Sequence, residues 1–231
     1  MFQLIVFDLD GTLVDSRRDI AESANATLVA CGAAPLPEDD IGRMVGDGAP
    51  VLVARAFAAA GFAQPADALD RFLAIYNSRL LRHTRPYDGI PELLAEIEPR
   101  AALAVLTNKP IEAARGVLEG LGLSRYFRAD QVVGGDGPFP RKPDPAGLRH
   151  LMASANASAD RTVLVGDSVV DWRTANAAST RVCLARYGFG WEGFPTDQLQ
   201  PGTWVVDSAR DLRRYLSPTA SRQPFLKKHD V

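Results

Sequence analysis

The sequence predicts an α/β protein in which a parallel sheet carries helices on both faces and a helical cap is inserted after the first strand. Two observations lead to this prediction. Short apolar runs rich in β-branched residues alternate along the chain with segments of helical spacing. The stretch from residue 16 to residue 82 interrupts this alternation, because it has several helical patterns and lacks a run typical of a strand.

The first strand is expected at residues 4–7, Leu-Ile-Val-Phe, directly before Asp8. A fully apolar run of this length is typical of a central parallel strand that is buried on both faces. Similar runs predict strands at 102–106, 162–165, 181–185 and 204–206, with a weaker one at 131–133. Helical spacing predicts helices at 89–97, 111–121, 145–155, 171–178 and 207–216. This order of elements predicts a Rossmann-like core.

The interrupting stretch is expected to form the cap. Its helical patterns cover residues 20–30, 51–60 and 66–81, and proline and glycine residues separate them. Phe72 and Tyr76, in the last of these patterns, are expected to pack in the cap core. The predicted division is a core of residues 1–15 and 83–217, a cap of residues 16–82, and a polar, aperiodic tail of residues 218–231 that is only loosely packed.

Composition limits the partners and the location. The net charge of -2, from 26 basic and 28 acidic side chains, gives no general attraction to nucleic acid or to an anionic membrane, so neither is expected as a partner. Cys31 and Cys183 lie far apart, which argues against a disulfide framework and a zinc site. The sequence lacks an apolar stretch near the roughly 20 residues of a membrane helix. A cytoplasmic location is the default expectation, and the oligomeric state is left open.

Polar residues that could carry chemistry follow several of the predicted strands. They are Asp8 and Asp10 after the first strand, Thr107 and Asn108 after the second, Lys142 in a loop before a helix, and Asp167 and Asp171 after the strand at 162–165. Ligands of an open parallel sheet bind outside the carboxyl ends of its strands. We therefore expect these residues to meet at one edge of the sheet, although more than 160 positions separate the first from the last.

The aspartates indicate a metal-assisted reaction on a phosphate. Asp8, Asp167 and Asp171 offer the hard oxygen ligands that Mg²⁺ prefers. The metal would screen the repulsion between a carboxylate nucleophile and a phosphate dianion, and it would stabilise charge on the phosphoryl oxygens. A carboxylate that forms an aspartyl phosphate is an established form of covalent catalysis.

The remaining residues supply the other parts of such a site. Thr107 can donate a hydrogen bond to a phosphoryl oxygen, and Lys142 can neutralise another. Asp10, left free of metal, can protonate the leaving oxygen and then deprotonate water. Each residue taken alone also fits a turn, a helix cap or a surface charge. Together, in this order and at these strand ends, they make a complete site for phosphoryl transfer.

The chain resembles the haloacid dehalogenase superfamily of phosphohydrolases from about residue 3 to residue 216. The four motifs of that superfamily correspond here to the segment from Asp8-Leu-Asp-Gly-Thr12 to Ser16, to Thr107, to Lys142, and to Gly166-Asp-Ser-Val-Val-Asp171. The resemblance implies that Asp8 is the nucleophile and Asp10 the acid/base. It also implies that Mg²⁺ is held by Asp8, the backbone carbonyl of Asp10 and Asp167, with Asp171 supporting the metal directly or through water.

By the same resemblance, Thr107, the backbone amide of Asn108, and Lys142 bind the phosphoryl group, and the helical insertion is a mobile cap that closes over a small substrate. Within the superfamily the chain is most similar to the bacterial phosphoglycolate phosphatases. This implies a small phosphorylated metabolite as substrate, with 2-phosphoglycolate as the first choice. The cap segment of residues 45–56 carries part of that similarity.

Residues of the cap are expected to contact the substrate. Arg43, Gly46 and Gly48 are the candidates for this contact. A compact anionic substrate also favours a basic group near the cap, for which Arg55 and Lys109 are further candidates.

Other functions remain open at this point. The core motifs act only on the phosphoryl group and do not distinguish the rest of the substrate. A phosphatase for a sugar phosphate, an amino-sugar phosphate or pyrophosphate is therefore an alternative. A phosphosugar mutase is a weaker alternative, since the cap has no sequence that marks one. A dehalogenase is disfavoured because Asp10 is present, and a non-enzyme is disfavoured because every expected catalytic position is filled.

Overall fold

The computed structural model describes residues 1–200 and 202–217 of the chain, so the predicted polar tail of residues 218–231 lies outside the described residues. A six-stranded sheet forms the core, with the strand order β5-β4-β1-β6-β7-β8. Its strands are β1 (Leu4–Phe7), β4 (Ala102–Leu106), β5 (Val132–Val133), β6 (Thr162–Gly166), β7 (Arg181–Ala185) and β8 (Trp204–Val206). All neighbouring strands in this sheet are parallel. The predicted parallel sheet is confirmed, with β1 in its interior.

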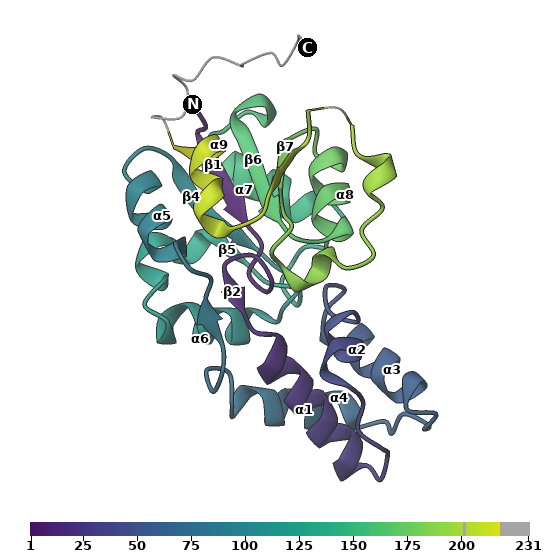
Figure 1. Cartoon of the computed structure of the whole chain (residues 1–231). Helices are drawn as coiled ribbons and strands as arrows, with labels where there is room; N and C mark the ends of the chain where they lie inside the picture. Colours follow the sequence, from purple (N-terminus) through teal and green to yellow (C-terminus); the bar gives the residue numbers. More distant parts are fainter. Residues whose placement is uncertain (201, 218–231) are drawn as a thin grey trace.

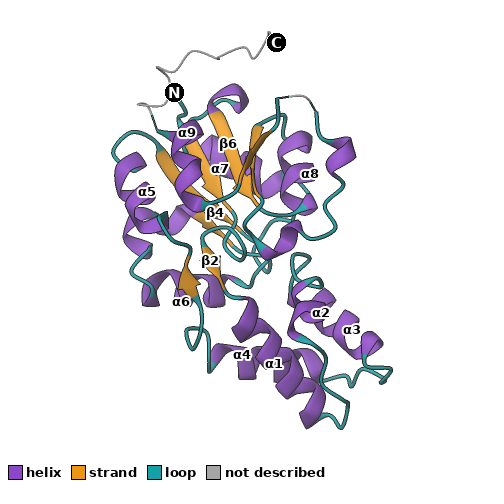
Figure 2. Ribbon diagram, viewed as in Figure 1, coloured by secondary structure: helices purple, strands orange, loops and turns teal. Residues whose placement is uncertain are grey.

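Both faces of β1 are buried, and its side chains alternate between two hydrophobic clusters. Ile5 and Phe7 belong to one cluster, whereas Leu4 and Val6 belong to the other. Helices α5 (Ile90–Ile97), α6 (Ile111–Gly120) and α9 (Arg213–Leu216) contribute to the first cluster, and α7 (Ala146–Ser154) and α8 (Val169–Ala177) contribute to the second. This arrangement explains the fully apolar sequence of the strand, because each face packs against helices. Figure 2 shows the helices around the sheet.

Four helices after β1 gather at one end of the sheet, opposite the end where the N-terminus lies (Figure 1). They are α1 (Arg17–Ala30), α2 (Glu38–Gly42), α3 (Ala49–Ala59) and α4 (Ala68–Asn77). Their apolar faces form a separate hydrophobic cluster that includes Leu28, Ile41, Phe57 and Phe72. The predicted helical cap after the first strand is therefore confirmed. It lies at the end of the sheet where the carboxyl ends of the parallel strands are found.

Two short strands lie where the chain leaves the core and returns to it. β2 (Val14–Asp15) pairs antiparallel with β3 (Arg85–Pro86). This pair is not among the predicted strands, because two residues are too few to show the hydrophobic alternation that is typical of a strand. The sequence analysis also missed α2, which has only five residues, and it extended α4 beyond Asn77. The exact division into core and cap residues remains a prediction.

Single turns of 3₁₀ helix connect several elements. They are η1 (Ser124–Tyr126), η2 (Ala129–Gln131), η3 (Ala159–Arg161), η4 (Phe189–Trp191), η5 (Thr196–Gln198) and η6 (Ala209–Leu212). The last of them runs directly into α9, so the helix expected at residues 207–216 begins as a 3₁₀ turn. Within the described residues, every helix is too short or too polar to cross a membrane.

Candidate active site

Three aspartates from two strand ends lie together at the edge of the sheet that faces the cap. Asp8 directly follows β1, whereas Asp167 and Asp171 follow β6, its neighbour in the sheet. One carboxylate oxygen from each lies within 4.8 Å of the others, and all three residues are buried. Burial is the main cause that raises the pKa of Asp8 to about 7, and Asp171 raises it further. Burial and the two neighbouring aspartates raise the pKa of Asp167 as well.

Lys142 supplies the positive charge inside this cluster. Its Nζ lies 2.6 Å from Asp171 Oδ1 and 3.0 Å from Asp8 Oδ1. Burial alone would lower the pKa of Lys142, but its attraction to Asp171 and Asp8 outweighs burial and raises that pKa. The ammonium is therefore charged, and it lowers the pKa of Asp8 against the effect of burial.

The two oxygens of Asp8 have different surroundings. Oδ1 accepts a hydrogen bond from the backbone N–H of Leu9 at 2.7 Å and also contacts Lys142. Within the described part of the chain, Oδ2 has no hydrogen-bond donor. This fixes the carboxylate through one oxygen and leaves the other available for a reaction.

Asn108 joins three segments around the site. Its side-chain Nδ2 donates to the backbone oxygens of Gly46 at 2.8 Å and of Lys142 at 3.0 Å, and its Oδ1 accepts from the Lys142 N–H at 2.8 Å. The Asn108 side chain thus positions the loop of Lys142 and also reaches the cap. Thr107 Oγ1 accepts a hydrogen bond from the Lys109 N–H at 3.2 Å, so its own hydroxyl proton is left to donate elsewhere.

Asp171 also caps a helix. Ser168 is the N-cap of α8, and its backbone N–H and hydroxyl donate to Asp171 Oδ2 at 3.1 and 2.6 Å. Because Lys142 binds Oδ1, both carboxylate oxygens of Asp171 are engaged within the protein. The geometry makes Asp171 an anchor for Lys142 and for the first turn of α8.

The carboxylate cluster fits a divalent metal cation. Its donors are hard oxygens, and glycines let the neighbouring backbone pack directly against the Asp167 carboxylate. A Cβ atom on Gly11, whose φ is +86°, would lie 1.9 Å from Asp167 Oδ2, and one on Gly188 would lie 2.4 Å from the same oxygen. Like charges this close are stabilised by a cation between them. Asp167 Oδ2 is also oriented by the N–H of Gly190 at 2.7 Å.

A cavity between core and cap opens onto these residues. Five predicted core residues line it together with the two predicted cap glycines: Asp8, Asp10, Thr107, Asn108, Asp167, Gly46 and Gly48. Apolar cap side chains line the other side: Ile20, Val45, Ala49, Leu52, Phe72, Leu73 and Tyr76. Lys142 and Asp171 are not among the lining residues and lie buried behind Asp8. The functional roles assigned to all these residues remain predictions.

The structure does not bring the two candidate cap arginines to this cavity. Arg43 forms ion pairs with Asp40 and, at 3.0 Å, with Glu192 of the core. Arg55 pairs with Asp47 at 2.6 Å. Neither arginine lines the cavity, and both side chains are close to half exposed. The predicted contact between Arg43 and the substrate is therefore untested. The position of the Arg43 side chain, outside the cavity lining, argues against it.

Lys109, one of the candidate basic groups for an anionic substrate, lines the cavity, whereas its contacts with Asp10 and Tyr76 were not predicted. Lys109 Nζ lies 2.9 and 3.0 Å from the two carboxylate oxygens of Asp10 and also contacts the Tyr76 hydroxyl. Burial raises the pKa of Tyr76 to about 12, so its hydroxyl stays protonated. Ser16 Oγ donates to Asp10 Oδ1 at 2.5 Å. Tyr76 does pack in the cap core as expected, but it also lines the cavity.

Comparison with known proteins assigns the class. Residues 5–185 match the haloacid dehalogenase-like hydrolase family, and the chain belongs to that family. It is 45% identical to a phosphoglycolate phosphatase of Rhodospirillum rubrum over 83% of each chain, and 38% identical to one of Agrobacterium fabrum over 89% of each chain. Its structure superposes with a TM-score of 0.84 on a predicted phosphoglycolate phosphatase of Haemophilus somnus, 30% identical, covering 92% of this chain and 97% of the other.

These relationships confirm the resemblance on which the sequence analysis relied, both to the family and to the bacterial phosphoglycolate phosphatases within it. The predicted enzyme class, a phosphoric monoester hydrolase, is confirmed with it. The cluster of Asp8, Asp167 and Asp171 offers buried carboxylate oxygens that could hold a divalent cation.

Proposed function

We propose that this enzyme is a Mg²⁺-dependent phosphatase that hydrolyses 2-phosphoglycolate through a phosphorylated Asp8. The observation that carries the proposal is the state of the Asp8 carboxylate. One of its oxygens is held by Leu9 N–H and Lys142, the other has no donor among the described residues, and Asp8 lines the cavity. An anchored carboxylate with one free oxygen is suited to attack a phosphorus atom held in front of it.

In the first step, Asp8 Oδ2 attacks phosphorus, and the bond between phosphorus and the ester oxygen breaks. Asp10 transfers its proton to the departing oxygen, which leaves as an alcohol. Thr107 donates its hydroxyl proton to a phosphoryl oxygen, and the backbone N–H of Asn108 is proposed to donate to another. Both residues line the cavity beside Asp8. Lys142 balances the charge of Asp8 from behind.

In the second step, Asp10 takes a proton from a water molecule, whose oxygen attacks the phosphorus of the phosphorylated Asp8. The bond from phosphorus to Asp8 Oδ2 breaks, which releases inorganic phosphate and restores both aspartates. Lys109 and Ser16 hold the Asp10 carboxylate in place for both proton transfers.

The metal is proposed to be Mg²⁺, held by Asp8, Asp167 and the backbone carbonyl of Asp10, with Asp171 in support. When bound, it supplies positive charge that lowers the repulsion between the Asp8 carboxylate and the phosphate dianion. Oxygen ligands alone make up this set, in keeping with the preference of Mg²⁺ for hard donors.

Replacement of the nucleophile tests the mechanism. Asp8→Asn is expected to lower Mg²⁺-dependent hydrolysis by at least about 1,000-fold, because an amide cannot form the phosphorylated intermediate. The measurement is phosphate release, with circular dichroism to verify the fold. Asp88→Asn, on a side chain that is 96% exposed, is the matched control and should keep full activity. Retained activity in Asp8→Asn would remove Asp8 as nucleophile.

A panel of phosphate esters tests the substrate. The proposal of 2-phosphoglycolate is supported by the similarity of the chain to phosphoglycolate phosphatases. The highest kcat/KM is expected for 2-phosphoglycolate, with lower values for sugar phosphates and pyrophosphate. Best turnover on a bulky sugar phosphate with negligible action on 2-phosphoglycolate would refute the choice of substrate and leave the mechanism standing.

A further inference from the structure

Lys109 is a cationic side chain in the wall of the cavity. Among the described residues that line the cavity, it is the one with a positive charge, since Lys142 lies behind Asp8 and both cap arginines point elsewhere. It follows β4 and is only 6% exposed. A buried ammonium in a cavity wall needs an anionic or strongly polar partner.

The position of Lys109 is on the side of the departing alcohol. Its Nζ lies 2.9 and 3.0 Å from the two oxygens of Asp10, the group that protonates the leaving oxygen in the proposed mechanism. The atoms of the alcohol that lie just beyond that oxygen must therefore come close to Lys109. In 2-phosphoglycolate, one methylene group separates the ester oxygen from a carboxylate, so that carboxylate falls within reach of the ammonium.

Tyr76 provides a second donor at the same place. Its hydroxyl contacts Lys109 Nζ, and the ammonium lies 4.5 Å from the centre of its ring. Because Tyr76 comes from cap helix α4 and Lys109 from the core, the two groups join across the cavity. The surrounding cap side chains, such as Ile20, Leu52 and Phe72, are apolar and give an anion no competing partner.

Lys109 has a donor to spare for a ligand. An ammonium carries three N–H groups, and a single N–H can bridge both oxygens of Asp10. A second N–H faces the Tyr76 hydroxyl. The third remains for an oxygen of the ligand.

From this geometry we propose that Lys109 and the Tyr76 hydroxyl form the subsite for a carboxylate on the leaving group, and that this subsite makes the enzyme prefer phosphate esters of small hydroxy acids over neutral esters. The inference rests on the proposed phosphatase function and adds to it the residues that bind the leaving group. A neutral alcohol would leave the ammonium without this extra partner, whereas a carboxylate gains a charge-assisted hydrogen bond.

A comparison of two substrates tests the subsite. The substrates are 2-phosphoglycolate and ethyl phosphate, which carries a methyl group in place of the carboxylate. In Lys109→Gln, the ratio of kcat/KM for 2-phosphoglycolate to that for ethyl phosphate is expected to fall about 10- to 100-fold, the usual value of a hydrogen bond between charged groups. Both rates also fall together, because Lys109 contacts Asp10, but that common loss cancels in the ratio.

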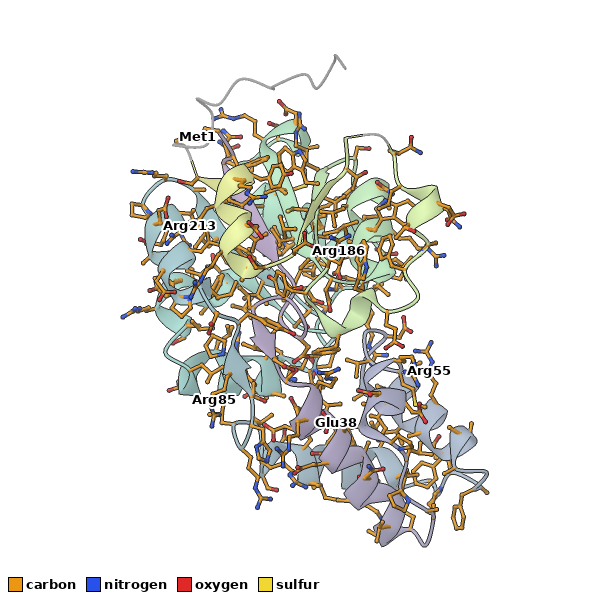
Figure 3. The ribbon with its side chains drawn as sticks, viewed as in Figure 1. Met1, Glu38, Arg55, Arg85, Arg186 and Arg213 are labelled. Atoms are coloured by element: carbon orange, nitrogen blue, oxygen red, sulfur yellow. The ribbon has the colours of Figure 1, made fainter. Side chains whose placement is uncertain are left out.

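Two further variants complete the test. Tyr76→Phe removes only the hydroxyl and keeps the apolar packing, so it should fold and lower the ratio about threefold to tenfold. Lys109→Arg keeps the charge and should restore part of the ratio. Arg55→Gln removes a positive charge from the cap away from the cavity, where Figure 3 labels the side chain, and should leave both rates within about twofold.

The outcomes separate the two proposals. A lower ratio in Lys109→Gln and in Tyr76→Phe supports the carboxylate subsite. An equal loss on both substrates in both variants overturns it and makes Lys109 a positioning residue for Asp10, while the phosphatase function stands. If the wild-type enzyme hydrolyses neither ester but does hydrolyse a larger phosphate ester, both the substrate choice and the subsite are wrong.

Discussion

At the scale of single residues, the environment of Asp8 changes the ionisation of its carboxyl group. Its carboxylate is buried beside Asp167 and Asp171, and burial raises its pKa from 3.8 to about 7. The folded protein therefore holds a proton on Asp8 in a pH range where the unfolded chain has released it. Stability from this group is full below about pH 4 and is lost as the pH rises to about 7.

This predicts a pH-dependent gain of stability in Asp8→Asn without metal. In excess chelator, the variant should exceed wild type in Tm, by an amount that grows from about pH 4 to about pH 7 and then stays constant. Thermal unfolding of both proteins across this range measures the difference. A difference that is constant over the whole range would show that the Asp8 pKa is not raised in the folded state. Asp88→Asn, with its exposed side chain, should give no pH-dependent difference.

The residues that could be located from sequence are those that directly follow a strand. Asp8, Thr107 and Asp167 each stand at the end of an apolar run, so the topology of a parallel sheet brings them together. Side-chain contacts between the cap and the core could not be predicted. The pairing of Lys109 with Tyr76 depends on how α4 packs over the core, a matter of tertiary packing that local periodicity does not encode.

At the scale of elements, the junction between cap and core depends on one buried carboxylate. Asp19, in the first turn of α1, accepts three hydrogen bonds of 2.8 Å through Oδ2, from the N–H groups of His83 and Thr84 and from the Thr84 hydroxyl. These bonds tie the start of the cap to the segment that leads back into the core. They act beside the β2–β3 pair, where the chain leaves and re-enters the sheet domain.

Asp19→Ala is expected to lower the free energy of unfolding by about 2–4 kcal/mol, because it leaves the N–H and hydroxyl donors at this junction without a hydrogen-bond acceptor. Urea denaturation of the metal-free protein measures the change. Asp70→Ala, at an exposed position in the first turn of α4, is the control and should cost less than about 1 kcal/mol. Equal effects of the two substitutions would mean that the Asp19 bonds add little to stability.

The strands that were predicted well consist mostly of apolar residues. β1, β4, β7 and β8 occur at the predicted residues, because strands of a parallel sheet covered by helices have mostly apolar sequences. The elements that were missed, α2 and the β2–β3 pair, have five residues or fewer. Unlike the equally short β1 and β8, these elements contain no apolar run, so their own sequence carries little signal.

At the scale of the whole molecule, the candidate active site lies between the sheet core and the hydrophobic cluster of the cap. The core sheet supplies the charged groups, and the cap supplies mostly apolar cover. Polar contacts cross the boundary, including Asn108 to Gly46 and Arg43 to Glu192. This division places the charged side chains on the sheet core and the apolar side chains on the cap.

Cation binding should therefore be visible in the stability of the whole molecule, independently of activity. Three buried aspartates repel one another in the metal-free protein, and a divalent cation relieves this repulsion. Mg²⁺ at about 100 times its dissociation constant adds about 2.7 kcal/mol, which corresponds to a Tm increase of about 5–10 °C for a protein of this size. Thermal unfolding with MgCl₂, against NaCl of equal ionic strength, measures the shift.

The same measurement on a variant assigns the shift to the aspartate cluster. Asp167→Asn removes one ligand and one of the repelling charges, so the variant should start at a higher Tm without metal and respond little to Mg²⁺. Asp88→Asn should respond as the wild type does, because the Asp88 side chain is exposed and its ion pair is with Arg210 rather than with a residue of the cluster. If Mg²⁺ raises the Tm of Asp167→Asn as much as that of wild type, the cation binds elsewhere, and Lys142 with the backbone N–H groups of Leu9 and Gly190 must stabilise the carboxylates at the ends of β1 and β6.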